Sequence, residues 1–244
     1  MRPAVDAPPG FGQLEVARWR AALRTRPWRD VLADAAALRV DGRYAAIVDP
    51  RSAALLTVLD LPPRARALVV GDRWGQLAVP LARHAAVTVL GAVPVALALL
   101  GDMAEQEGVH LALCVGRLES APLVAECFDA VLMYAGLGES PPPRGAVALS
   151  AAAALLAPGG TIVVAGASPD REGGMTWPAA PADVATAGLV ETARFACLPD
   201  HQAPDYLIAP PLLDHFFATW APATWQVAPP TPAWLVFLRR EDVQ

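Results

Sequence analysis

The sequence predicts an α/β protein organised around a mostly parallel β-sheet. Short apolar runs that end at Gly or a polar residue alternate with helical stretches over most of the 244 residues. Such an alternation favours parallel strands joined by right-handed crossover helices. The composition agrees, because 55% hydrophobic and 18% charged residues supply more core-forming side chains than a usual soluble domain has. At about 150 residues per domain, the length corresponds to one domain, or to one domain with a cap.

The first quarter of the chain is predicted to be helical. Apolar residues recur at three- and four-residue spacing from Phe11 to Leu61, and Asp49-Pro50 is typical of a helix start. Pro62-Pro63 then interrupts the chain, and the pattern changes to that of strands. We therefore expect a helical lid or extension over residues 1–61, followed by the main domain over residues 62–244.

Strands and helices alternate in the core of the main domain, residues 65–168. The strands are expected to be covered on both faces, because their runs are apolar throughout. The expected strands are residues 67–71, 86–91, 110–116, 128–134 and 160–166, and the expected helices are residues 76–84, 94–106 and 144–156.

The C-terminal part, residues 169–244, has a weaker pattern. Turn formers and small residues over residues 168–188 fit a loop and one short helix. Beyond them we expect a strand near residues 191–198, a helix over residues 212–220 and a last strand over residues 234–239.

Charge and cysteine content exclude several classes of function. The 19 basic residues, all of them Arg, are outnumbered by 24 acidic ones and form no run, so the chain lacks the basic surface typical of nucleic-acid binding. Cys114, Cys127 and Cys197 are odd in number and far apart, which indicates a reduced, cytoplasmic protein without a zinc site. The spacing of His and carboxylate residues does not indicate any other metal centre.

Export and membrane insertion are not predicted either. Residues 1–10 contain no apolar core before a cleavage site. Two long uncharged stretches, residues 85–101 and 145–169, are divided by turn residues, Pro94 in the first and Pro158-Gly159-Gly160 in the second. We therefore expect them to be strands and helices of a buried sheet.

Three segments carry a family resemblance. They are ALVVGDRWGQLAVPLAR from residue 67, FDAVLM from residue 128 and LLAPGGTIVVAG from residue 155. Together they resemble the glycine-rich first strand, loop and helix, the fourth strand, and the turn into the fifth strand of class I S-adenosylmethionine-dependent methyltransferases. The resemblance covers about residues 65–240 and implies a Rossmann-like, seven-stranded, mostly parallel sheet with a reversed last strand. It also implies S-adenosylmethionine as the cofactor.

The resemblance places one part of the cofactor site in the loop after the first strand. Gly71 and Gly75 match the outer glycines of the family pattern, with Asp72 between them, while Arg73 replaces the middle glycine and Val69 an acid. Glycine at such a turn lets the main chain approach the cofactor carboxylate at a helix N-terminus. The cationic side chain of Arg73 therefore begins where bare main chain is expected.

The next two strand ends lack the acidic residues that the resemblance implies. Gly91 ends the second strand, where a carboxylate normally accepts hydrogen bonds from the ribose hydroxyls. Arg117 ends the third strand, where an acceptor for the adenine amino group is usual, and Glu119 follows two residues later. Since a hydrogen bond to a charged acceptor contributes about 1.5–3 kcal/mol, losing the ribose acceptor predicts an affinity for the cofactor roughly a hundredfold lower.

Three residues are candidates for the catalytic group. Tyr134 and Glu139 follow the fourth strand, near which the resemblance places the methyl acceptor, and a base there removes the proton of the acceptor. His201 lies beside Asp200 and Asp205 and suits an acid, a base or a metal ligand. The alternatives are structural: Tyr134 caps the sheet, Glu139 is solvated, and His201 belongs to a polar surface turn.

Three functions remain open at this point. The first is a methyltransferase for a small-molecule or sugar-like acceptor, since CLPDHQAPDYLIAP (residues 197–210) resembles a bacterial subgroup from sugar and cell-surface polysaccharide pathways. The second is a catalytically inactive pseudo-methyltransferase that serves as a protein partner or scaffold subunit in a homo- or hetero-oligomer. The third is an enzyme that binds an anionic ligand through Arg73 and Arg117 in the same crevice.

Overall fold

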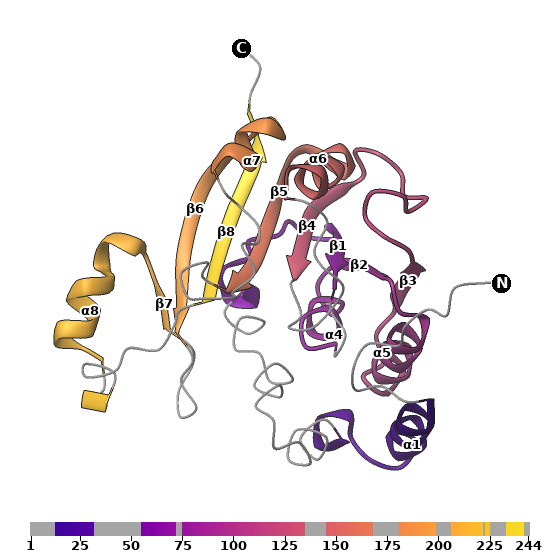
Figure 1. Cartoon of the computed structure of the whole chain (residues 1–244). Coiled ribbons are helices and arrows are strands. Elements are labelled where there is room, and N and C mark those ends of the chain that lie inside the picture. The colour runs from indigo at the N-terminus through magenta and orange to yellow at the C-terminus, as the bar shows by residue number, and fades with distance from the viewer. Residues whose placement is uncertain are drawn as a thin grey trace.

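A single β-sheet runs through the described part of the chain (Figure 1). The computed structural model describes residues 13–31, 55–71, 75–134, 145–167, 181–198, 206–221, 223–224 and 233–241. Eight strands are paired there in the order β3-β2-β1-β4-β5-β8-β6-β7. They are β1 (Arg66–Val70), β2 (Ala86–Gly91), β3 (Leu111–Val115), β4 (Phe128–Tyr134), β5 (Leu156–Ala167), β6 (Leu189–Leu198), β7 (Tyr206–Ile208) and β8 (Ala233–Arg240).

The strand directions confirm the predicted fold class. β1 to β5 are parallel to one another, and β8 is antiparallel to both of its neighbours, β5 and β6. The described sheet has one strand more than the seven predicted, because β7 pairs with β6 at the sheet edge. Its three residues are too few for an alternating pattern to be recognised in the sequence.

The helices occupy the predicted places with shifted ends. The described helices are α1 (Gln13–Leu23), α4 (Ala78–Leu81), α5 (Pro94–Gln106), α6 (Gly145–Leu155), α7 (Pro181–Thr186) and α8 (Leu213–Thr219), with a short 3-10 helix, η1 (Pro210–Leu212). The helix expected over residues 76–84 is shortened to α4. Pro80 lies within it, and proline has no N–H to complete the helical hydrogen-bond pattern.

Helices pack on both faces of the sheet and bury side chains there. Residues of β1 and β2 alternate between two hydrophobic clusters, as the period of two along a strand requires. One cluster joins Val69 and Val89 to Leu100 of α5, and the other joins Leu68 and Leu90 to Leu149 of α6. This two-faced burial explains why the strand sequences are uniformly apolar.

The N-terminal segment belongs to the first of these clusters. Trp19 and Leu23 of α1, followed by Trp28 and Val31, are buried against the same core as α5. Leu55, further along the chain, is 1% exposed in that cluster. The described part of residues 1–61 therefore shares a hydrophobic core with the main domain.

Two features lie at the periphery of the sheet. Residues 116–127, which connect β3 to β4, contain no helix, and β3 is an edge strand. Beyond the opposite edge, α8 stands away from the sheet in Figure 1, and none of its residues is buried. No helix in the described part of the chain is long and apolar enough to cross a membrane.

Candidate functional site

The topology of the sheet marks the carboxyl ends of its parallel strands as a binding edge. The strand order changes direction at β1, because β2 lies on one side of β1 and β4 on the other. In open α/β sheets, ligands bind outside the carboxyl ends of the strands at such a switch point. Gly71 follows β1, and Tyr134 ends β4, so the main chain of both residues lies at this switch point.

The turn after β1 is built around glycines at both of its ends. Gly71 has φ +89° and Gly75 has φ +69°. Residues that have a side chain rarely adopt such values. The N–H of Gly71 donates to the carbonyl of Leu90 over 3.2 Å, which ties the turn to β2. A Cβ on Gly75 would lie 2.9 Å from Cγ2 of Val79, so the chain also needs glycine there for space.

Val69 takes no part in this edge. Its side chain is fully buried in the first hydrophobic cluster. At the position where the sequence resemblance implies an acidic residue, the protein therefore has a buried apolar side chain.

The end of β2 carries no polar side chain. Gly91 is half-buried, and its N-terminal neighbour Leu90 is in the core. The three atoms nearest to a Cβ built on Gly91 all belong to the side chain of Leu97, the first of them at 3.2 Å. The position therefore supplies no side-chain acceptor, and adding one requires the buried Leu97 to shift by a few tenths of an ångström.

The end of β3 carries a cation instead of an acid. The N–H of Gly116 donates to the carbonyl of Gly91 over 3.0 Å, so the ends of β2 and β3 are held side by side. Arg117 follows directly, and its carbonyl accepts from the N–H groups of Ser120 and Ala121, which forms a tight turn. The side chains of Arg117 and Glu119 are both exposed.

The structure brings together only some of the predicted site residues. Gly71, Gly75, Gly91, Arg117 and Glu119 lie at or just beyond the ends of β1, β2 and β3. The main chain of Tyr134 lies at the end of β4, opposite Ala165 of β5, but its side chain is outside the description. Four other predicted residues lie outside the described residues altogether, namely Asp72, Arg73, Glu139 and His201.

The described side chains include no metal-binding cluster and no disulfide bond. No three His, Cys, Asp or Glu residues of the described ranges gather in a way that could hold a metal ion. All three cysteines are free thiols, with Cys197 buried and Cys114 and Cys127 half-buried.

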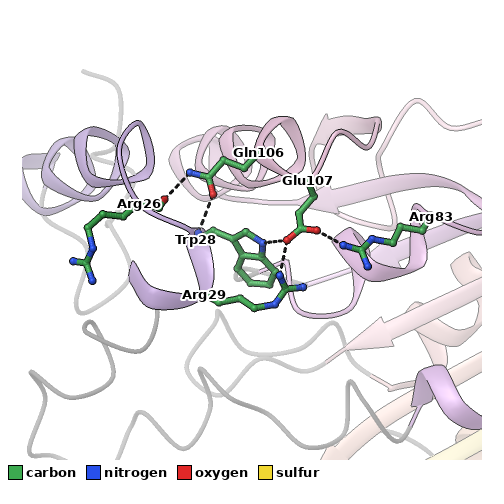
Figure 2. Close-up of polar contacts among 6 residues, drawn as sticks. All are labelled: Arg26, Trp28, Arg29, Arg83, Gln106 and Glu107. Atoms are coloured by element: carbon green, nitrogen blue, oxygen red, sulfur yellow. Dashed lines mark hydrogen bonds and ion pairs between the residues drawn. The ribbon is translucent and has the colours of Figure 1, made fainter.

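A polar cluster that the sequence did not suggest lies at the far end of α5 (Figure 2). The Gln106 amide donates to the carbonyls of Leu23 and Arg26, the latter over 2.8 Å, and its Oε1 accepts from the N–H of Trp28 over 2.8 Å. The Gln106 side chain thus forms hydrogen bonds with main-chain groups at the end of α1 and at the start of the helical turn that follows. Such terminal groups have no partner within their own helix. Since α5 starts near the end of β2, this cluster is remote from the candidate site.

Glu107 completes that cluster. Its Oε1 accepts from Nε1 of Trp28 and from Nη1 of Arg29, each over 2.6 Å, and its Oε2 accepts from Arg83. These donors, Trp28 foremost, hold the pKa of the Glu107 carboxyl below its ordinary value. One turn earlier on α5, Asp102 accepts two hydrogen bonds from Arg20, over 2.5 and 3.0 Å. The contacts attach the N-terminal segment to α5.

One family model and several solved structures are similar to this chain. Residues 67–160 match the family model described as a methyltransferase domain. No curated protein matches the chain. The matched region contains β1 to β4 and the start of β5, and therefore all the strand ends described above.

The similarity to solved structures covers more of the chain than the family model does. A methyltransferase candidate from Bacillus halodurans is 15% identical, with a TM-score of 0.57 over 78% of this chain and 98% of its own. The N-methyltransferase NodS from Bradyrhizobium japonicum, solved with S-adenosyl-L-homocysteine, is 17% identical, with a TM-score of 0.53 over 94% of this chain and 98% of its own.

A third similar structure is geranyl diphosphate C-methyltransferase from Streptomyces coelicolor. It is 13% identical, with a TM-score of 0.55 over 89% of this chain and 99% of its own. At these identities the likeness concerns the fold, and function has to be argued from the site.

Proposed function

We propose that the protein binds S-adenosylmethionine weakly and methylates a small-molecule acceptor, because residues 67–160 match the family model of a methyltransferase domain and the fold is similar to that of solved methyltransferases. The observation that carries the proposal is the pair of positive-φ glycines, Gly71 and Gly75, that follows β1 at the switch point of the sheet. Gly71 lies at the carboxyl end of β1, where the missing side chain lets a ligand approach the main chain, whereas Gly75 is buried against the core.

The residues present suit the two halves of the cofactor unequally. The glycine turn after β1 is compatible with close approach of the amino-acid half, whose carboxylate is favoured at exposed main-chain N–H groups. The adenosine half meets Gly91, which has no acceptor, and the exposed cation of Arg117. We therefore propose a low affinity for S-adenosylmethionine, mainly because the ribose hydroxyls lack a hydrogen-bond acceptor at Gly91.

A small acceptor is proposed from charge and from the nature of similar proteins. The chain has a net charge of −5 and no basic run, so a nucleic-acid acceptor is disfavoured. The C-methyltransferase from Streptomyces coelicolor was solved with geranyl diphosphate, a small molecule. A sugar-like acceptor, which the segment over residues 197–210 suggests, belongs to the same class of small molecules.

The experiment is a calorimetric titration of S-adenosyl-L-homocysteine into the wild-type protein and the Gly91→Asp variant. A carboxylate at the end of β2 restores an acceptor for the ribose hydroxyls, and the atoms nearest to a Cβ there belong to the side chain of Leu97, at 3.2 Å or more. We expect Gly91→Asp to bind at least about tenfold more tightly, since about 1.4 kcal/mol is enough for that factor.

The control is Val124→Asp, which adds the same carboxylate shortly before the amino end of β4, away from the carboxyl ends of the strands. Val124 is 71% exposed, so this variant should fold and bind like the wild type. Equal affinities for all three proteins would remove the ribose argument. If all three are folded and none binds at about millimolar concentration, the proposed function is wrong.

A second function is favoured by the missing hydrogen-bond acceptors at the ends of β2 and β3. The acceptors that the family uses at the ends of β2 and β3 are replaced by Gly91 and Arg117. A pseudo-methyltransferase that keeps the sheet and acts as a partner or scaffold subunit would need neither acceptor. The titration separates the two functions, because this second one predicts no binding by the wild type and no methyl transfer.

A further inference from the structure

The edge strand β3 is unusually apolar for its position. β3 pairs with β2 and with no other described strand. Its side chains Leu113 and Val115 are 40% and 55% exposed. Natural edge strands are normally protected from pairing by charges, proline, bulges or a covering element. The sequence from Val109 to Gly116, VHLALCVG, has no acidic residue, Arg or proline, and its register with β2 is regular.

The connection that follows β3 provides no helix to cover this edge. Helices follow β1, β2 and β4 in chain order, but residues 116–127 after β3 contain none. Among the described residues, no further strand pairs with β3.

The main chain of β3 points its free groups outward at alternate residues. The N–H of Gly116 is directed at β2, where it donates to the carbonyl of Gly91. Since N–H and C=O of one residue point the same way and alternate along a strand, Ala112 and Cys114 also face β2. Leu111, Leu113 and Val115 consequently direct their N–H and C=O groups away from the sheet.

We propose that β3 pairs with β3 of a second copy of this chain, antiparallel and centred on Leu113. A twofold axis at Leu113 places Leu111 of each copy opposite Val115 of the other, and all of these residues have outward main-chain groups. Each facing pair then exchanges main-chain hydrogen bonds. The exposed side chains of Leu113 and Val115 are brought together across the axis, and an isologous interface of this kind closes on itself.

Charge at the two ends of the strand agrees with an antiparallel arrangement. Arg117 lies just beyond the carboxyl end, and the exposed acid Glu105 precedes the amino end, whereas Glu107 is already paired with Arg29 and Arg83. The twofold axis sets Arg117 opposite Val109 of the second copy, four residues after Glu105. A parallel pairing would instead place the two Arg117 side chains next to each other, where like charges repel.

The experiment measures mass by sedimentation velocity across a range of concentrations, from about 5 to about 200 μM, because an interface this small suits micromolar affinity. The wild type is expected to approach twice its 25.6 kDa chain mass at the upper end. Val115→Arg is expected to weaken dimerisation at least tenfold. Val147→Arg on α6 is the matched control, since Val147 is also 55% exposed, and should dimerise like the wild type.

A cross-link tests the register directly. In a hydrogen-bonded antiparallel pair the Cα atoms lie about 5.5 Å apart, within the range that a disulfide spans. With Cys114→Ser and Cys127→Ser as background, Leu113→Cys is expected to give a covalent dimer on mild oxidation, and Val147→Cys is not. A wild type that stays monomeric at the highest concentration overturns the proposal. So does a dimer that Val115→Arg leaves intact and Leu113→Cys fails to cross-link.

Discussion

Gly75 excludes a side chain for two independent reasons. Its φ of +69° disfavours any residue with a Cβ, and that Cβ would lie 2.9 Å from Cγ2 of Val79 and 3.2 Å from Cδ1 of Leu100. Both neighbours are in the core and cannot move freely. We expect Gly75→Ala to lower the free energy of unfolding by about 2–4 kcal/mol, which urea unfolding followed by circular dichroism would measure.

Gly188 provides the control for the backbone part of this cost. It has a similar φ of +66°, but a Cβ there would have no heavy atom within 4 Å. Gly188→Ala should therefore cost only about 1–2 kcal/mol. If both substitutions lower the free energy of unfolding by the same amount, the close contact with Val79 does not add to the effect of Gly75→Ala.

Single positions also show how far the site could be read from sequence. The glycines at 71 and 75 were predicted as a turn, and both have the left-handed φ that makes glycine necessary. The missing acceptor at Gly91 was visible in the sequence, whereas the contact with Leu97 that decides whether one could be restored was not. That contact depends on the packing of α5 against β2, which no local pattern encodes.

Helix α5 links the N-terminal segment to the sheet through residues on its last two turns. Asp102 and Gln106 lie four residues apart and thus on one side of the helix, where α1 packs. Glu107 adds contacts to Trp28 and Arg29 of the same segment and to Arg83 of the main domain. Side chains separated by about 80 residues in sequence are therefore joined at one helix end.

Glu107 makes this attachment dependent on pH. Its pKa lies below the ordinary 4.5, so its ionised form stabilises the folded protein. That contribution is complete above the ordinary pKa and disappears as the pH falls through the lowered one. We expect Glu107→Gln to be less stable than the wild type at neutral pH, with a difference that shrinks as the pH drops below about 4.5. Urea midpoints at a series of pH values measure it.

Glu105→Gln is the matched control for that titration. Glu105 is an exposed acid on the same helix, two residues earlier. Its substitution should change stability little at any pH. A difference between Glu107→Gln and the wild type that stays constant down to about pH 3 would contradict the proposed role of the carboxylate.

The elements were predictable where a local signal marks their ends. α5 begins and ends where the sequence indicated, with Pro94 at its first position. α4 is shorter than expected because of Pro80, and β7 was missed because only pairing with β6 makes it a strand. Tertiary contacts, and not local propensity, therefore define the elements that were predicted least well.

The molecule as a whole is held by two hydrophobic clusters on the two faces of one sheet. The first contains Trp19 and Trp28 of the N-terminal segment as well as side chains of β1, β2 and α5. The sequence suggested a lid or extension over residues 1–61, set apart by Pro62-Pro63. Its amphipathic pattern could indicate that one face is buried, but not which surface buries it.

This shared core predicts that the N-terminal segment and α5 open together. Trp19, Leu23, Trp28 and Val31 are each at most 7% exposed, and Gln106 and Glu107 hold them in place, so separating the segment would expose apolar surface and unpaired polar groups. In native-state hydrogen exchange, peptides from residues 13–31 should be protected to a similar degree as those from residues 94–106, because regions that unfold as one unit share one opening free energy. A lid that opens independently would give the opposite result, with rapid exchange over residues 13–31 while α5 stays protected. The Glu107→Gln variant should then leave exchange in α5 unchanged, whereas a common unit requires both regions to exchange faster.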